Sequence, residues 1–248
     1  MPTMRHDAFR RQTVFGVSAI ALLATWAGAM AADRQPWSPT SHERTFEALG
    51  IRDGSTVCEI GAGDGAAAIA AARLVGEKGR VYASELGERR IKALQDAIAA
   101  SALSTVIVVT GEETQTNLPR EGCDAIFMRD VYHHLAKPAA INASLLAAAK
   151  PGARVAVVDF TPPNDEAPTP EERGKDGMHG VYPETVEREM KEAGFEVVSS
   201  DKGQRWFMVV VRRPDRGGTE KRGGLKTRGR ARLRDTRTTR VAGGSGPS

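Results

Sequence analysis

The chain has 248 residues, with 35 lysines and arginines against 31 acidic residues and a formal net charge of +4. This length allows one or two domains, but both ends differ in composition from the middle, so we expect one folded domain over residues 32 to 213. Residues 214 to 248 carry a net charge of +7 and residues 1 to 31 carry +2, which leaves the middle at −5. The basic character of the chain is therefore a property of its ends and not of the folded domain.

Residues 1 to 31 have the pattern of a signal peptide. Three arginines precede an uncharged, mostly apolar stretch over residues 14 to 32, and Ala29-Met30-Ala31 forms a small-x-small cleavage site. We expect cleavage after Ala31 and export to the periplasm or the outside of the cell. The alternative is an uncleaved membrane anchor, because 19 uncharged residues are just long enough to cross a bilayer.

Strand patterns alternate with helix patterns between the two ends, which is typical of a doubly wound α/β fold. The almost continuous β-branched run over residues 105 to 110 predicts a buried strand. The Pro-rich residues 161 to 182 contain no convincing element, and we expect them to form a lid or a mobile binding loop. In chain order we predict a helix over 41–49, a strand over 57–60, a helix over 66–75, a strand over 79–85, a helix over 88–100, strands over 105–110 and 123–129, a helix over 139–149, a turn over 150–153, a strand over 154–159, a helix over 183–193 and strands over 195–199 and 205–212.

The C-terminal residues 214 to 248 are rich in glycine, arginine and threonine and contain almost no large apolar side chains. Such a segment cannot bury enough surface to offset the entropy of ordering, so we expect it to be disordered and dispensable for folding. An arm that binds RNA or an anionic surface is the alternative interpretation, although basic runs bind polyanions weakly and without sequence information.

A glycine-rich turn connects the first predicted strand to the helix that follows it. Gly61, Gly63 and Gly65 stand at every second position, and Glu59 lies two residues before the first glycine. A strand, a glycine turn and a helix form the nucleotide-binding unit of doubly wound folds. The spacing G-x-G-x-G differs from the dinucleotide pattern G-x-G-x-x-G, so it favours S-adenosylmethionine over NAD and disfavours a nucleotide-dependent dehydrogenase.

With these motifs in order, residues 45 to 212 resemble the class I S-adenosylmethionine-dependent methyltransferases, particularly the small-molecule branch related to ubiquinone and menaquinone biosynthesis enzymes. The resemblance implies a Rossmann-like, seven-stranded, mostly parallel sheet with an antiparallel last strand, and S-adenosyl-L-methionine as cofactor. It also implies a small organic substrate and no specific nucleic-acid partner. Nucleic-acid amino-methylating enzymes of this fold carry an Asp/Asn-Pro-Pro-aromatic loop after the fourth strand, where this chain has Arg129-Asp130-Val131-Tyr132.

The resemblance also assigns the residues around the cofactor. Glu85 stands 20 residues after Gly65 at the end of the second predicted strand, where a carboxylate accepts hydrogen bonds from ribose hydroxyls. Glu112 follows the third strand at the position that lies by the adenine in the family. The predicted cofactor-binding residues are Glu59, Gly61, Ala62, Gly63, Gly65, Glu85, Glu112 and Arg129.

The segment after the fourth predicted strand, Asp130 to His134, faces the sulfonium and the substrate in the family. Asp130, His133 and His134 are the candidate catalytic residues, because a base is needed when the acceptor nucleophile carries a proton, and histidine suits neutral pH. Tyr132 and, from the loop over 161–182, His179 are the candidate substrate contacts. The alternative is that the histidines only shape the pocket.

Neither a disulfide nor a metal site is expected. In neighbouring regular strands Cys58 and Cys123 are offset by about four residues, roughly 13 Å, so both are interpreted as small buried hydrophobic residues. The only close pair among the five histidines is His133-His134, whose side chains diverge on a regular element.

A second functional hypothesis is an exported, non-catalytic binding protein built on a methyltransferase scaffold. It follows from the predicted signal peptide, because S-adenosylmethionine is made in the cytosol and export separates the protein from that supply. The complete glycine turn and the two carboxylates Glu59 and Glu85 favour retained cofactor binding, but binding alone does not establish turnover.

Overall fold

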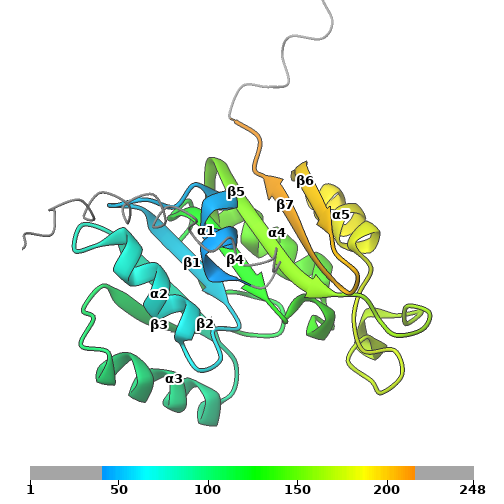
Figure 1. The fold of residues 1–248 in the computed structure, drawn as a ribbon, viewed down its shortest axis with the longest axis horizontal. Helices are drawn as coiled ribbons and strands as arrows, with labels where there is room; N and C mark the ends of the chain where they lie inside the picture. Colours follow the sequence, from blue (N-terminus) through cyan, green and yellow to red (C-terminus); the bar gives the residue numbers. More distant parts are fainter. Residues whose placement is uncertain (1–40, 216–248) are drawn as a thin grey trace, which may run out of the picture. The chain divides into compact units, whose positions relative to one another are not determined.

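The seven strands of the domain form a single sheet in a computed structural model that describes residues 41–215 (Figure 1). The predictions for residues 1–31 and almost all of the C-terminal tail therefore lie outside the described residues. The sheet has the order β3-β2-β1-β4-β5-β7-β6, and β7 runs antiparallel to both of its neighbours. This confirms the predicted doubly wound α/β fold. The strands are β1 (Thr56–Ile60), β2 (Arg80–Glu85), β3 (Val106–Thr110), β4 (Cys123–Arg129), β5 (Ala149–Phe160), β6 (Glu196–Lys202) and β7 (Trp206–Arg212).

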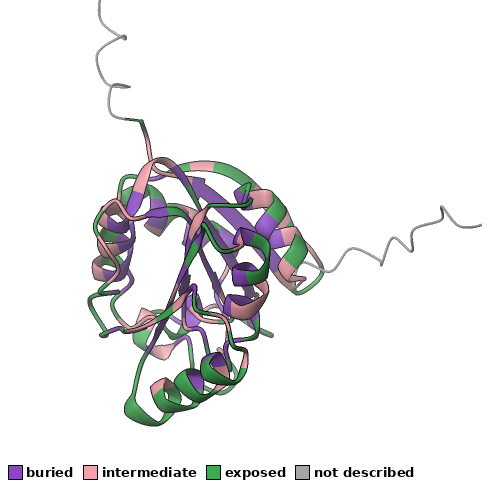
Figure 2. Cartoon of the chain, turned by 90° about the vertical axis from the view of Figure 1, so that its left-hand side faces the viewer, coloured by how far each residue is buried: buried purple, intermediate pink, exposed green. Residues whose placement is uncertain are grey.

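Five α-helices cover the two faces of the sheet, and each face has its own apolar core. The helices α1 (His42–Leu49), α2 (Ala66–Val75) and α3 (Glu88–Ala100) pack on one face, and α4 (Pro138–Ala148) and α5 (Pro183–Glu192) pack on the other. The strands supply both cores because successive side chains alternate between faces, so Val57 enters the first core and Cys58 the second. The buried residues in Figure 2 accordingly concentrate in the strands and on the inner sides of the helices.

The ends of α1 follow from two residues. The Ser41 side chain accepts a hydrogen bond from the Arg44 backbone N–H at 3.3 Å, as a helix N-cap does. Gly50 ends the helix in the left-handed conformation, with φ at 69°. Phe46 and Leu49 are buried against the sheet at the predicted i, i+3 spacing.

Two predicted elements differ from the observed ones. β3 lies at the edge of the sheet and none of its residues is buried, with Ile107 38% exposed, so the prediction of a buried strand was wrong. Val106 and Val108 pack on the core but remain partly exposed, so the β-branched run reflects strand propensity more than burial. The predicted turn over 150–153 is also not separate, because β5 begins at Ala149 and incorporates Gly152, whose φ is +77° and whose N–H donates to the Arg213 carbonyl at 3.0 Å.

Cys58 and Cys123 form a disulfide, so the prediction of unpaired cysteines was wrong. Cys58 lies opposite Ile126, three residues beyond Cys123 in β4, and a regular strand would keep the two cysteines apart. However, the pairing of β4 is irregular between Cys123 and Ala125, and Cys123 packs in the same core as Cys58 while Ala125 packs in the other. The Cα atoms are therefore 5.9 Å apart, within the range for a disulfide.

Hydrogen bonds of Arg213 connect the residues after β7 to the rest of the domain. Arg213 donates from its backbone N–H to the Ala153 carbonyl at 2.9 Å, and its side chain bonds Glu121 at 2.9 Å. Within residues 41–215, no helix has both the length and the apolar character needed to span a membrane.

We predict that the Cys58–Cys123 bond stabilises the folded body. It closes a loop of 65 residues, so its loss in the Cys58→Ala/Cys123→Ala variant should cost about 2–4 kcal/mol and lower the melting temperature by roughly 5–15 °C. Thermal unfolding followed by circular dichroism measures this change. Two reactive thiols in the denatured, unreduced protein would contradict the pairing.

Candidate cofactor and acceptor site

A cavity of about 590 Å³ lies at the carboxyl ends of β1, β2 and β4. Its volume is within the range of small-molecule sites, and its position is the place where open α/β sheets bind ligands. Seven of the predicted site residues line it: Gly61, Gly63, Glu85, Glu112, Arg129, Asp130 and His134. Six predicted residues do not: Glu59, Ala62, Gly65, Tyr132, His133 and His179.

The three glycines of the turn have positive φ angles, but they serve different purposes. A Cβ on Gly61 would lie 2.4 Å from the Val131 side chain, and a Cβ on Gly65 would lie 2.9 Å from the Leu94 side chain. These two glycines therefore allow the turn to pack against the segment after β4 and against α3. Gly63 has no heavy atom within 4 Å of its Cβ position. Its open side leaves room for a ligand to approach the backbone in the cavity.

Glu85 joins the end of β2 to the glycine turn. Its Oε2 accepts a hydrogen bond from the Gly63 N–H at 2.8 Å, its Oε1 accepts one from the Leu86 N–H at 2.7 Å, and Arg90 lies 3.2 Å away. The residue is only 6% exposed, yet it lines the cavity. Because a carboxylate has about four acceptor positions, the predicted ribose contact remains compatible with these bonds.

Glu59 is a buried acid whose hydrogen bonding is incomplete. It is 4% exposed, and its Oε2 has no hydrogen-bond partner among the described residues. Burial raises the pKa of Glu59 well above its usual range, and the positive charge of Arg129 opposes that rise. Conversely, burial lowers the pKa of Arg129, and Glu59 opposes the decrease. Arg129 lines the cavity, so Glu59 acts on the site through the charge of Arg129.

Glu112 lies at the edge of the cavity, directly after β3. Its side chain accepts a hydrogen bond from the Asn117 amide at 3.1 Å, and its N–H donates to the Gln115 carbonyl at 2.7 Å. Asn117 also donates to the Thr110 carbonyl at 3.0 Å, which closes the turn on the end of β3. The turn therefore orients Glu112 at the cavity, as predicted for a residue near the cofactor base.

The three histidines His133, His134 and His179 lie together beside this cavity, and we call them the histidine cluster. The first two lie on a 3-10 turn (η1, Tyr132–His134), where their ring centroids are 3.9 Å apart. The prediction that their side chains diverge was wrong, because it assumed a regular strand or α-helix. His134 faces the cavity, whereas His133 is fully buried behind it. Burial and the neighbouring imidazoles of His133 and His179 lower the pKa of His134.

Asp159 holds His133 in place. Its Oδ1 lies 2.8 Å from Nδ1 of His133, its Oδ2 accepts from the His133 backbone N–H at 3.2 Å, and its Oδ1 also accepts from the Phe160 N–H at 2.8 Å. Both side chains are completely buried. Asp159 was not among the predicted site residues. Its position as an acidic residue near the carboxyl end of a buried parallel strand is the feature that could have identified it.

The segment over 161–182 is more structured than predicted. It contains a second 3-10 turn (η2, Pro170–Glu172), and buried Arg173 bonds both carboxylate oxygens of Glu189 on α5, at 2.5 and 3.2 Å. Gly180 has a φ of +135°, and a Cβ there would lie 2.6 Å from the Pro162 nitrogen. The bonds of this segment place His179 so that its Nε2 lies 2.8 Å from Nε2 of His133.

Tyr132 does not fit the predicted substrate contact. It is fully buried, its hydroxyl donates to Glu189 at 2.9 Å, and it accepts from the Asn142 amide at 2.8 Å. Burial and the Glu189 charge raise the pKa of Tyr132 well above its usual range. The tyrosine therefore links η1 to α4 and α5 as a structural residue.

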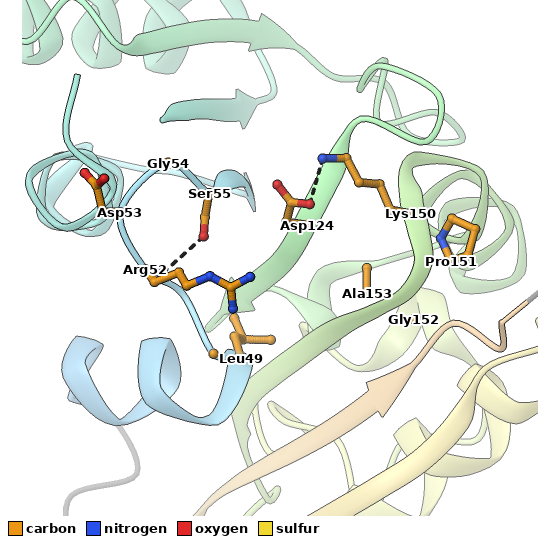
Figure 3. A pocket seen from close by; sticks show the side chains of 11 residues that line it. Leu49, Arg52, Asp53, Gly54, Ser55, Asp124, Lys150, Pro151, Gly152 and Ala153 are labelled. Carbon is orange, nitrogen blue, oxygen red and sulfur yellow. Dashed lines mark hydrogen bonds and ion pairs between the residues drawn. The ribbon is translucent and has the colours of Figure 1, made fainter. Parts of the chain in front are cut away.

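A second cavity, of about 400 Å³, lies toward the amino ends of the strands and does not have the features of a cofactor site (Figure 3). Several of its polar groups pair with one another: Lys150 bonds Asp124 at 2.6 Å, and the Ser55 hydroxyl accepts from the Arg52 N–H at 3.1 Å. Asp124 also accepts from the Thr56 N–H at 2.8 Å. We assign this cavity a structural role.

Comparison with known proteins connects this geometry to a family. A family model described as a methyltransferase domain matches residues 31–200. A ubiquinone/menaquinone biosynthesis C-methyltransferase from Pseudomonas putida is 28% identical over 127 residues, which cover 49% of this chain and 48% of that protein. The chain thus matches about half the length of such curated relatives.

Solved structures share the fold. A SAM-dependent methyltransferase from Aquifex aeolicus is 30% identical to this chain, with a TM-score of 0.59. The match covers 69% of this chain and 89% of the Aquifex aeolicus chain. The [4+2]-cyclase SpnF is 14% identical with a TM-score of 0.61, covering 70% and 80%, and shares the fold alone. S-adenosylmethionine is the cofactor of the protein, and the cavity, with its glycine turn and carboxylates, has groups that fit it.

We predict opposite stability effects for the same substitution at two buried acids. Glu59→Gln should raise the melting temperature of the cofactor-free protein at neutral pH by roughly 2–4 °C, because it removes a buried charge with an unbonded oxygen. Glu85→Gln should lower the melting temperature, because one of two backbone N–H donors would then face an amide N–H₂ group.

The effect of Glu59→Gln should also depend on pH. A raised pKa in the folded state means that the folded protein binds more protons than the unfolded one above pH about 4.5. Glu59 thus contributes stability at low pH that is lost as the pH rises through its folded pKa. The melting-temperature difference between Glu59→Gln and the unsubstituted protein should therefore grow from pH 4.5 toward neutral pH, and a constant difference would contradict the assignment.

Proposed function

The chain belongs to the methyltransferase domain family, and we propose that it transfers the methyl group of S-adenosylmethionine to a small organic acceptor. One observation carries this proposal. Glu85 and Glu112 lie on one side of the glycine-lined cavity, and His134 and Asp130 lie on the opposite side, in the segment after β4. A cofactor held by Glu85 and Glu112 therefore lies beside two titratable side chains, His134 and Asp130, that can bind the methyl acceptor.

S-adenosylmethionine supplies a methyl group bonded to a positively charged sulfur, and methyl transfer is an in-line displacement. The main task of the protein is then to align the acceptor and to exclude water. Glu85 and Glu112 hold the nucleoside end, while Gly63 leaves the backbone open to the ligand. The segment from Asp130 to Leu135 forms the acceptor side, because it leaves the carboxyl end of β4 beside the glycine turn.

His134 is the residue that we assign to proton removal from the acceptor. It is the member of the histidine cluster that lines the cavity, and an imidazole accepts protons near neutral pH. His133 is completely buried and bonded to Asp159, so it orients the cluster from behind. Asp130 also lines the cavity; it has a φ of +59° and donates its N–H to the Val158 carbonyl at 2.9 Å, which fixes the start of the acceptor segment.

We further propose that the protein is exported. The sequence pattern over residues 1–31 motivates this location, and the Cys58–Cys123 bond supports it, because structural disulfides are typical of oxidising compartments. Intact mass spectrometry of the protein from its native compartment should give an N-terminus at Ala32 and a mass lower by about two hydrogens than that of the reduced chain. A chain that retains Met1 would contradict cleavage, and residues 14–32 would then be the membrane anchor.

The experiment for methyl transfer uses the purified full chain with S-adenosylmethionine carrying an isotopically labelled methyl group. It is incubated with a panel of small acceptors that present hydroxyl, thiol, amine or activated ring-carbon nucleophiles, and the labelled product and S-adenosylhomocysteine are quantified. We expect transfer to at least one class. Binding of S-adenosylmethionine by calorimetry without transfer to any acceptor would favour the alternative, an exported non-catalytic binding protein.

His134→Ala should slow single-turnover transfer by about 10²-fold or more and leave cofactor affinity nearly unchanged, because Gly61, Gly63, Glu85 and Glu112 lie at the ends of β1, β2 and β3 and not on the turn that carries His134. Glu85→Ala should instead weaken cofactor binding by roughly 1–3 kcal/mol through loss of hydrogen-bond acceptors. Lys150→Ala, in the second cavity, should leave both quantities unchanged. Full activity of His134→Ala would leave alignment alone as the source of rate.

A further inference from the structure

The histidine cluster brings three imidazoles from two distant segments to one point. Nε2 of His133 and Nε2 of His179 are 2.8 Å apart, and one ring nitrogen from each of the three residues lies within 4.8 Å of the others. Three of the five histidines in the chain thus converge, although 44 residues separate His134 from His179. We propose that His133, His134 and His179 form a binding site for a divalent transition metal ion of the Zn²⁺ type.

The first support is the group behind the cluster. A metal-bound histidine usually donates its second ring N–H to a carboxylate, which fixes the tautomer and the ring orientation. A carboxylate can only accept, so the 2.8 Å contact with Asp159 assigns the hydrogen to Nδ1 of His133. In the neutral ring, the lone pair then lies on Nε2, the nitrogen that faces His179. The ring is therefore already in the form that binds a metal.

The second support is the balance of charge. Asp159 is completely buried, and among residues 41–215 its ion-pair partner is His133 alone. Buried carboxylates need a compensating positive charge. A divalent cation at Nε2 of His133 provides this charge through the ring, without leaving a protonated imidazole beside the two other histidines.

The third support is that the site can adopt metal distances with a small movement. Zn–N bonds of about 2.0–2.1 Å in a tetrahedral arrangement place two nitrogens roughly 3.3 Å apart, about 0.5 Å more than the observed 2.8 Å. His133 is fixed by Asp159, whereas His179 is only partly buried and lies on a loop. An outward shift of His179 therefore suffices, and His134 is exposed enough to rotate toward the ion.

The loop that carries His179 is shaped to approach the cluster closely. A Cβ on Gly174 would lie 3.1 Å from Nδ1 of His134, and Gly180 directly follows His179 in a conformation that disfavours a side chain. The aromatic ring of Phe160 covers the cluster at 4.8 Å from His133 and 5.1 Å from His179. Backbone and aromatic groups thus lie close to all three imidazoles.

This inference goes beyond the proposed methyl transfer and does not depend on it. In the metal-bound state His134 is a ligand and cannot accept a proton, so its assignment as the base applies to the metal-free protein. Three histidine ligands leave a position for water or another ligand in a four-coordinate site. Because His134 also lines the cofactor cavity, the open coordination position of the metal lies next to the acceptor region. The competing interpretation is a metal-free hydrogen bond, in which Nε2–H of His179 donates to Nε2 of His133.

The test is metal binding by the full chain, produced without a histidine tag and stripped with a chelator. Zn²⁺ is titrated by calorimetry, and Co²⁺ is added separately because its visible spectrum reports tetrahedral coordination. We expect one equivalent of either ion to bind with a dissociation constant in the micromolar range or below. The measurement contains neither S-adenosylmethionine nor an acceptor, so a failure of metal binding is separate from a failure of methyl transfer.

The variants locate the ion. His179→Ala, a partly exposed loop residue, should abolish stoichiometric binding without unfolding the body, and Asp159→Asn should weaken binding by about 10–100-fold. The double variant His6→Ala/His42→Ala removes both histidines outside the cluster and should bind as the unsubstituted chain does. Absence of stoichiometric binding, or binding that His179→Ala retains in full, would overturn the proposal and leave the metal-free hydrogen bond.

Discussion

The position of β1 between β2 and β4 is the constraint on which the site depends. The chain proceeds from β1 outward to β2 and β3, and then returns to the other side of β1 to form β4, and the helices that follow β1 and β4 lie on opposite faces of the sheet. Gly61 follows β1 and Val131 follows β4, and the absent Cβ of Gly61 is what allows the two loops to touch. The cavity therefore lies between the ends of β1, β2 and β3 and the segment that follows β4.

Asp159 extends this arrangement to the second half of the domain. It lies in β5, which pairs with β4, and it bonds the turn that follows β4. Because the neighbouring Phe160 carbonyl accepts from the Val181 N–H at 3.0 Å, the same end of β5 also positions the loop that carries His179. One strand end therefore aligns two segments that the sequence separates, and the histidine cluster is a consequence of sheet register.

The sequence predicted the elements whose causes are local. The helix predicted over 41–49 agrees with α1, which Ser41 and Gly50 delimit by capping in the structure, and parallel strands bring Gly61 and Glu85 to one edge without any knowledge of side-chain contacts. It failed where an irregularity or a distant partner decides the outcome. The irregular pairing after Cys123 permits the disulfide, and neither the Asp159–His133 contact nor the Tyr132–Glu189 bond leaves a periodic pattern.

Hydrogen bonding distinguishes the roles of the three buried acids near the carboxyl edge. Glu85 and Asp159 each accept from two backbone N–H groups, so their oxygens have hydrogen-bond partners before any ligand binds. Glu59 retains a buried oxygen without a partner and has a raised pKa. A domain with only structural requirements would lose nothing by replacing such an acid. Its electrostatic interaction with Arg129, which lines the cavity, indicates that the sheet tolerates this cost in order to tune the charge of the site.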